Sequence, residues 1–147
     1  MSLRTPVIAG NWKMNTDVES GVALAQDILE LSDRVSGVDK IVCPPFVIVP
    51  PVVDILAGSS IQVGVQNASA HSDGAFSGEI STSMLAKLVS HVIVGHSERR
   101  TLFGETSAVV AEKAIAVADA GLCPILCIGE GLEVRKEGRA ESFVAAQ

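Results

Sequence analysis

Residues 91–100, with the sequence HVIVGHSERR, join a short apolar run to a polar segment. The run His91–Val94 is rich in β-branched residues, which predicts a buried strand. A short helix is predicted from Ser97 to about Leu102, because a polar segment with an early acidic residue is typical of a helix start. His96 therefore lies where a strand ends and a helix begins. In proteins built from repeated strand–helix units, catalytic side chains gather at this end of the strands.

Four similar apolar runs occur elsewhere in the chain, and helical patterns separate them. With His91–Val94, the predicted strands are Val7–Ala9, Lys40–Cys43, Ile61–Val65 and Pro124–Ile128. The first two predicted helices run from a capping box of Thr16 and Glu19 to Gly37, and from Pro50 and Pro51 to about Gly58. The other helices are predicted at Ser81–Val89, at Ser107–Ala120, and at Glu130–Gln147 with a break at Gly138.

This order predicts an α/β protein with five parallel strands, each followed by a helix, in one domain over residues 1–147. Such units form either an open sheet with helices on both faces or an incomplete barrel. A complete βα barrel takes about 250 residues and eight strands. The spacing of the strands alone leaves both alternatives open.

The composition argues against several classes of function. The formal net charge is −6 and no block of Lys or Arg occurs, so nucleic acids and anionic membranes are not expected partners. No apolar run reaches the roughly 18–20 residues of a spanning helix, and the N-terminus lacks the core of a signal peptide. Cys43, Cys123 and Cys127 show no metal-like spacing, and we interpret them as reduced core residues of a cytoplasmic protein.

Asn11 and Lys13 directly follow the first predicted strand. Lys13 can place an ammonium where a small anionic substrate would bind, and Asn11 can hold the lysine or a substrate oxygen. The alternative is a solvated lysine beside a turn-forming asparagine. The residues alone do not decide between the two.

His96 and its neighbours offer a second candidate group. A helix N-terminus disfavours a positive imidazolium, so the ring is expected to be neutral, able to donate to a carbonyl oxygen and to pass protons. The alternatives are a capped core histidine or a surface residue. Glu98 either pairs with Lys13 or only favours the helix start. Arg99 and Arg100 are either surface charges or ion-pair partners at an interface.

A loop with glycine near each end, Gly74–Glu79, follows the third strand and carries an apolar Phe76 at its tip. An exposed aromatic side chain in a protruding loop predicts a docking contact. The alternative is a loop that folds back on its own domain. Glu130, after the last strand, either orients a group at the mouth of the sheet or begins the next helix.

Taken together, these motifs resemble the triosephosphate isomerase family, and the resemblance covers essentially all 147 residues. The segments that carry it, in chain order, are Gly10–Asn15, Gln66–Asn67, Gly74–Glu79, Gly95–Arg100 and Cys127–Glu130. The resemblance implies the first five units of an eight-unit barrel, a partial TIM barrel that is incomplete without a C-terminal piece. It also implies a cytoplasmic enzyme of glycolysis and gluconeogenesis that needs no cofactor and no metal.

The resemblance also implies roles for individual residues. Lys13 and Asn11 would bind and attract a triose phosphate, His96 would be the neutral electrophile for which the family is known, and Glu98 would join their polar network. The loop 67–79 would insert into a neighbouring subunit, with Ser77 keeping the hydroxyl of the threonine usual in the family. The residues expected at that interface are Met14, Phe76, Ser77, Glu79 and Arg99.

The family's catalytic glutamate, mobile lid and phosphate-binding glycines belong to later strands and have no match here. Without a base, proton abstraction beside the carbonyl has no agent, so this chain alone is expected to be inactive. The main hypothesis is the N-terminal part of a split or truncated isomerase, completed by a C-terminal half-barrel chain. The rival hypothesis is a non-catalytic half-barrel that associates with itself through its exposed strand edges.

Overall fold

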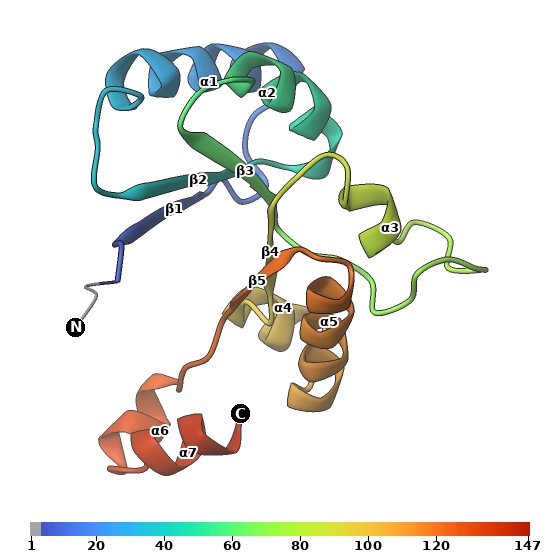
Figure 1. Ribbon diagram of the computed structural model, residues 1–147. Coiled ribbons are helices and arrows are strands. Elements are labelled where there is room, and N and C mark those ends of the chain that lie inside the picture. The colour runs from blue at the N-terminus through green and yellow to red at the C-terminus, as the bar shows by residue number, and fades with distance from the viewer. Residues whose placement is uncertain (1–3) are drawn as a thin grey trace.

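The computed structural model describes residues 4–147, and at its centre lies a curled sheet of five parallel strands (Figure 1). The strands pair in chain order, each with the next. Their bounds are β1 Val7–Asn11, β2 Asp39–Cys43, β3 Ile61–Val65, β4 His91–Val94 and β5 Cys123–Leu126. The curl answers the question that strand spacing left open, because the sheet is part of a βα barrel. Residues 1–3, the first of the predicted domain, lie outside the described part.

Helices follow each strand, as predicted, although some of their bounds differ. They are α1 Val18–Ser32, the 3-10 turn η1 Phe46–Ile48, α2 Val49–Leu56, α3 Thr82–Leu85, α4 Ser97–Leu102, α5 Ser107–Asp119, α6 Leu132–Lys136 and α7 Ala140–Ala146. The prolines at the start of α2 and the break at Gly138, where φ is +70°, are confirmed. The prediction of a long third helix is wrong, because α3 has only four residues.

The predicted capping box at the start of the first helix is displaced by one residue. Asp17 is the N-cap of α1, and its carboxylate accepts a hydrogen bond from the backbone N–H of Ser20. Thr16 has a left-handed backbone with φ of +73° and lies outside the helix. Asp and Thr are both good caps, so the sequence alone does not separate these neighbours.

Alternating side chains of the strands face two apolar clusters on opposite sides of the sheet. On the outer side, Val42 and Val92 pack with residues of α1, α2 and α5. On the other side, Ile41, Cys43 and Ile93 form a smaller cluster. Cys43 is fully buried, and this burial raises the pKa of its thiol to about 12.

The two edge strands of the sheet, β1 and β5, have exposed apolar side chains. Ile8 of β1 is 65% exposed, and Leu126 of β5 is 53% exposed. Cys123 at the start of β5 is exposed too, so the prediction that all three cysteines are core residues is wrong for this one. Its strand lies at the edge of the sheet and, among residues 4–147, pairs with β4 alone. The sheet therefore presents two apolar edges.

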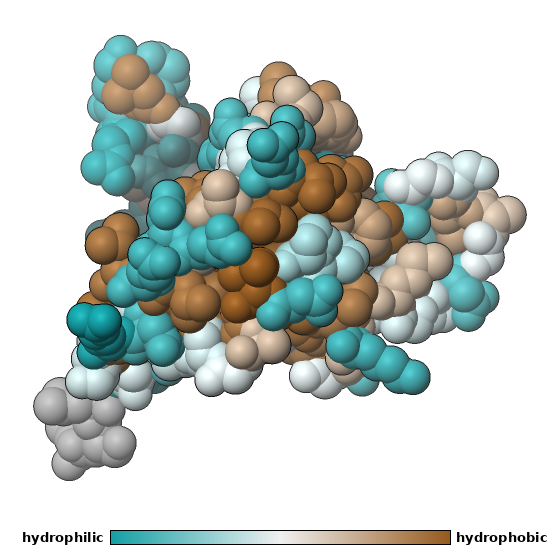
Figure 2. Space-filling view, turned by 90° about the horizontal axis from the view of Figure 1, so that it is seen from above, coloured by the Kyte–Doolittle hydropathy of each residue, from teal (hydrophilic) through white to brown (hydrophobic). Residues whose placement is uncertain are grey.

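The remaining segments lie around this body. The helices α6 and α7 bury no residue, and Figure 1 shows them apart from the helices that cover the sheet. The loop between β3 and α3 protrudes from the body, as both Figure 1 and Figure 2 show. None of the helices within residues 4–147 has the length and apolarity that a membrane crossing requires.

Lys40, at the start of β2, is a buried cation that holds the end of α1. Its ammonium donates to the backbone carbonyls of Ser32 at 2.8 Å and Val35 at 2.7 Å, and to the hydroxyl of Ser60 at 2.7 Å. Lys40→Met leaves these acceptors without a donor, so we expect the free energy of unfolding to fall by about 1–3 kcal/mol. Urea denaturation followed by the fluorescence of Trp12 measures this loss.

The control for Lys40 is Lys136→Met, which removes an exposed lysine paired with Glu133 on α6. An exposed pair contributes about 0–1 kcal/mol. Equal urea midpoints for the Lys40 variant and the control would contradict a stabilising role for the buried ammonium.

Candidate active site

The predicted catalytic side chains meet across the mouth of the curled sheet, at the carboxyl ends of β1 and β4. The ammonium Nζ of Lys13 lies 3.2 Å from Nε2 of His96 and 2.5 Å from Oε1 of Glu98. Because β1 and β4 are not neighbours in the sheet, the curl is what brings these groups together. The structure thus has Glu98 in an ion pair with Lys13, one of the two alternatives that the sequence left open.

The backbone of Lys13 is held in an unusual conformation. Its φ is +58°, a left-handed value that is uncommon for a residue with a side chain. The Oδ1 atom of Asn11 accepts a hydrogen bond from the N–H of Lys13 at 3.0 Å, and the amide of Gln66 donates to its carbonyl at 2.8 Å. These two bonds fix the peptide groups on both sides of Lys13 and so direct its ammonium.

His96 is the N-cap of α4, and its ring nitrogens face different partners. The backbone N–H of Glu98 donates to Nδ1 at 3.3 Å, and the tautomer that this bond favours carries the ring proton on Nε2. Nε2 then presents its N–H beside the ammonium of Lys13, so that two donors face one space. A carbonyl oxygen that lies within hydrogen-bond distance of both nitrogens would accept from both.

Glu98 takes part in this group as an anion that pairs with Lys13. The hydrogen bond from Lys13 is the main cause that holds the pKa of the Glu98 carboxyl below its usual value, and the positive charge of Lys13 adds a smaller contribution. A carboxylate with a lowered pKa is a poor proton acceptor near neutral pH. Glu98 therefore suits orientation of Lys13 better than abstraction of a proton.

Two polar residues of this region, Gln66 and Glu105, have contacts for which the sequence predicted no role. Gln66 directly follows β3 and bonds to the carbonyls of both Lys13 and Cys43. Glu105 follows α4 and is buried, and its Oε1 accepts from Arg99 and from Lys113 at 2.6 Å each. A polar residue just after a strand is a signal that could have identified Gln66, whereas Glu105 lies in a loop with no such signal.

The Glu105 cluster connects three parts of the chain. Lys113 of α5 also donates to Oδ1 of Asn67, at the base of the protruding loop. Arg99 of α4 lies over the ring of Phe103 at 4.8 Å. The other oxygen of Glu105 has no hydrogen-bond partner among residues 4–147. Arg99, predicted at an interface, is thus already engaged in an intramolecular ion pair.

Glu105→Gln should destabilise the fold, because it leaves Arg99 and Lys113 without their anion. We expect the free energy of unfolding to fall by about 2–3 kcal/mol at neutral pH. Burial alone would raise the pKa of Glu105, but the hydrogen bonds from Lys113 and Arg99 outweigh it and bring the pKa below its ordinary value of 4.5. The stabilisation is therefore complete above about pH 4.5 and is lost as the pH falls through the lower, folded-state pKa.

Urea denaturation at pH 7 and at pH 3 checks both parts of the Glu105 prediction. The control is Glu133→Gln, which alters only an exposed pair with Lys136. The difference between Glu105→Gln and the original chain should shrink at the lower pH. A difference that stays the same at both values would mean that the charge of Glu105 is not what stabilises the fold.

Beside the Lys13–His96–Glu98 group lies a groove of about 650 Å³ with an apolar wall. Exposed side chains of Met14, Phe46, Leu102 and Phe103 contribute to it. Met14 is 96% exposed. Such a groove beside polar groups suits another polypeptide segment that packs over the mouth.

The residues of the protruding loop lie at the surface. Phe76 is 43% exposed, and its ring stacks on the ring of His71 with a centroid distance of 4.0 Å. Ser77 is exposed, while Glu79 contributes to the groove beside Lys13. The loop is therefore available for a contact outside its own domain.

Glu130 lies outside this loop, just before α6, and pairs with Arg135 at 2.6 Å.

Comparisons with known proteins agree with this geometry. The family model described as "Triosephosphate isomerase" matches residues 6–147. Triosephosphate isomerases of Dehalococcoides mccartyi strain CBDB1 and Thiobacillus denitrificans are 45% and 47% identical to 99% of this chain, which spans 57% and 58% of their lengths. The crystal structure of triosephosphate isomerase from Bartonella henselae matches with a TM-score of 0.89 and 39% identity, over 97% of this chain and 60% of that one. The chain belongs to the triosephosphate isomerase family.

Proposed function

We propose that this chain supplies the first five βα units of an isomerase barrel that interconverts dihydroxyacetone phosphate and D-glyceraldehyde 3-phosphate. The observation that carries the proposal is the meeting of Lys13 and His96, whose Nζ and Nε2 atoms lie 3.2 Å apart at the mouth of the sheet. Two hydrogen-bond donors aimed at one space suit a carbonyl oxygen that gains negative charge during the reaction. We place this enzyme in the cytoplasm, in glycolysis and gluconeogenesis.

In this proposal each residue has a distinct task. Lys13 attracts the anionic substrate and stabilises the negative charge on its oxygen, while His96 donates from Nε2 to the same oxygen and moves a proton between the two adjacent oxygens. Glu98 orients the ammonium of Lys13 through their ion pair. The reaction needs no cofactor, since the oxidation of one carbon is balanced by the reduction of its neighbour and the substrate undergoes no net change in oxidation state.

We infer that the base that removes the carbon-bound proton comes from outside residues 4–147. Glu98, Glu105 and Glu130 each already pair with a cation. Glu79 also lines the groove beside Lys13, but it belongs to the loop 67–79 that we assign to contact with a neighbouring subunit. We therefore propose that a C-terminal half-barrel chain pairs with the edges of β1 and β5 and provides a glutamate base and a phosphate site. Binding energy from that phosphate site would support the transition state.

The test is to mix this chain with the C-terminal part of the Dehalococcoides relative, beginning after the position aligned with Gln147. We expect a complex by size-exclusion chromatography and isomerase activity in the same fractions. The control is the same mixture with a His96→Gln chain, which should form the complex with far lower activity. If the mixture gives neither a complex nor activity, the proposal fails.

A second candidate function is a non-catalytic half-barrel that associates with itself. The exposed apolar side chains of β1 and β5 favour it, because bare strand edges pair readily with other chains. Light scattering on the purified chain distinguishes the two. A stable homo-oligomer that excludes the C-terminal piece would favour self-association over the enzyme.

Phe76→Asp should disrupt the association of completed barrels with one another. We propose that the loop 67–79 of one subunit packs into the groove beside Lys13 of its neighbour, so a charge at position 76 would enter an apolar contact without a partner. Light scattering should give the mass of a single completed barrel.

The matched control for Phe76 is Leu31→Asp on α1, a side chain that is 81% exposed and far from this loop in the sequence. It introduces the same charge and should leave the mass unchanged. If Phe76→Asp also leaves the mass unchanged, the loop folds against its own subunit.

A further inference from the structure

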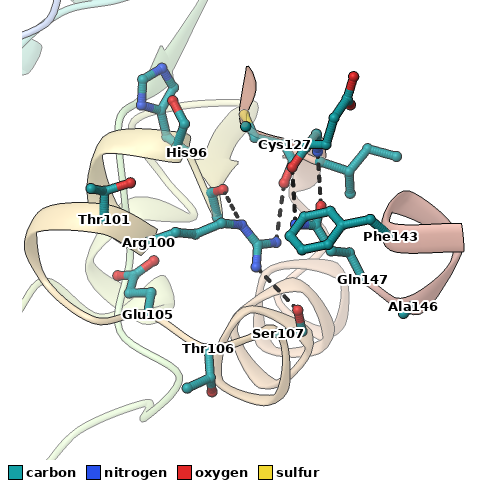
Figure 3. A pocket seen from close by; sticks show the side chains of 16 residues that line it. His96, Arg100, Thr101, Glu105, Thr106, Ser107, Cys127, Phe143, Ala146 and Gln147 are labelled. Carbon is teal, nitrogen blue, oxygen red and sulfur yellow. Dashed lines mark hydrogen bonds between the residues drawn. The ribbon is translucent and has the colours of Figure 1, made fainter. Parts of the chain in front are cut away.

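Arg100 of α4 connects three elements beside a second cavity, of about 750 Å³, whose lining also includes His96 (Figure 3). Its Nε donates to the carbonyl of Gly95 at 2.8 Å. Its Nη1 donates to the hydroxyl of Ser107 at 3.2 Å, and its Nη2 donates to the carbonyl of Cys127 at 3.2 Å. One guanidinium thus joins the end of β4, the start of α5 and the end of β5.

The partners of this arginine are unusual because none of them is an anion. No carboxylate of residues 4–147 lies within ion-pair distance of Arg100, in contrast to Arg99 next to it, which pairs with Glu105. The β4–β5 pairing continues through a bond from Cys127 N–H to the Val94 carbonyl at 2.9 Å. The carbonyls of Gly95 and Cys127 lie beyond that bond, and Arg100 supplies the donors that the sheet does not.

The bond to the Gly95 carbonyl bears directly on His96, because both belong to one peptide unit. That carbonyl, the nitrogen of His96 and the Cα of His96 lie in one rigid plane. A donor that fixes the carbonyl therefore fixes the point from which the imidazole projects. This is a link of one covalent unit and involves no chain of intermediate residues.

The space around Gly95 leaves this peptide little freedom to move. Its φ of +70° is in the left-handed region, and an added Cβ would lie 2.6 Å from Cγ1 of Val110 and 3.0 Å from Nη2 of Arg100. Gly95 thus lies directly between the guanidinium and α5. Glycine is needed here both for the backbone angle and for the close approach.

We propose that Arg100 is a positioning residue for His96, acting through the carbonyl of Gly95, and that it keeps Nε2 of His96 directed at the substrate oxygen. The assignment rests on the proposed function of His96 and extends it to a residue that does not touch the substrate. It also explains why a half-buried guanidinium bonds to backbone carbonyls next to a catalytic candidate instead of pairing with a carboxylate. Without Arg100, the imidazole of His96 should still lie at the mouth of the sheet, but Nε2 should no longer be directed at the substrate oxygen.

A spectroscopic test uses the chain as it is. The ¹⁵N resonances of the His96 ring report which nitrogen carries the proton and what it bonds to. In Arg100→Met we expect both ring resonances to shift and broaden, while Arg100→Lys, which keeps a cation and one set of donors, gives a smaller shift in the same direction. The matched control is Arg139→Met, which removes an exposed arginine paired with Glu137, and it should leave the ring unchanged.

Ring resonances of His96 that match those of the original chain in the folded variants would overturn the proposal, even if backbone signals of Gly95 and Cys127 move. If Arg100→Met does not fold, Arg100→Lys decides by the same criterion. Only the ring signals separate positioning of His96 from a plain structural tie between β4 and β5.

An activity measurement adds a second readout once the barrel is completed by a C-terminal piece. Arg100→Met should lower kcat by about 10²-fold, the effect of a displacement of about 1 Å at a catalytic group, with KM nearly unchanged. A fall in kcat no larger than that of Arg139→Met would count against the proposal. If the original chain gives no activity in that mixture, the proposed function fails, and the ring resonances still decide the role of Arg100.

Discussion

His96→Gln in the completed barrel should lower kcat by about 10²–10⁴-fold, the range usual for loss of an acid–base group. Glutamine can donate a hydrogen bond from its amide, so part of the stabilisation of the substrate oxygen survives. It cannot pass a proton between two oxygens, because a side-chain amide, unlike an imidazole, does not readily give up and take back a proton on nitrogen. KM should change much less than kcat, since the carbonyl contact strengthens as negative charge develops.

The matched control for this prediction is His91→Gln, at the opposite end of the same strand. The ring of His91 bonds to the hydroxyl of Ser90, and burial lowers its pKa. This substitution should leave kcat unchanged although it removes the same kind of side chain from β4. An unaffected kcat in His96→Gln, measured in the same completed barrel, would contradict the assignment of His96 as electrophile and proton carrier.

Most of the fold could be predicted because the central strands β2, β3 and β4 are buried and therefore read as apolar runs. The edge strands β1 and β5 read in the same way because they too are apolar, although the structure leaves them exposed. The run Ile61–Val65 became β3 and His91–Val94 became β4 with no change of bounds. The third helix was predicted too long, since its apolar pattern continues to Val89. The structure ends the helix at Leu85, and the N–H groups of Leu88 and Val89 both bond to the carbonyl of Leu85 before Ser90 bonds to the carbonyl of Val63 in the sheet.

The site could be predicted in part, for a similar reason. Polar residues that directly follow a predicted strand can be recognised in the sequence. The curl of the sheet then brings Lys13 and Glu98 together, although they are 85 residues apart in the chain. The contacts of Glu105 could not be predicted, because Lys113 and Arg99 are ordinary exposed-looking charges in the sequence. The cluster forms only in the folded chain, where Glu105 in the loop after α4 lies between Arg99 and Lys113. Hydrophobic periodicity says nothing about which charges pair in the interior.

The direction in which the Lys13 side chain points could not be predicted from the sequence. The left-handed backbone of Lys13 has no local signal, since lysine does not favour it. The two side chains that hold it are those of Asn11, at the end of β1, and Gln66, just after β3. A strained backbone that persists at a candidate site indicates that its surroundings impose it. Here the surroundings place the ammonium beside His96.

Lys13→Met in the completed barrel should lower kcat/KM by about 10²–10³-fold or more, the cost of losing one donor to a developing oxyanion. KM should rise and kcat should fall together, because the ammonium attracts the anionic substrate before the reaction and stabilises the charge formed during it. Methionine keeps most of the length and apolar stem of lysine, so the loss reports the charge. Steady-state kinetics with dihydroxyacetone phosphate and with D-glyceraldehyde 3-phosphate measure both terms.

Ionic strength separates the two tasks of this lysine. In the original enzyme added salt should raise KM, because it screens the attraction between the ammonium and the substrate, and this dependence should be weaker in Lys13→Met. The control Lys87→Met removes an exposed lysine after α3 and should change neither kcat/KM nor its salt dependence. A Lys13 variant with a normal rate would place this residue outside the site. A normal kcat with a raised KM would restrict it to binding, and His96 alone would then stabilise the substrate oxygen.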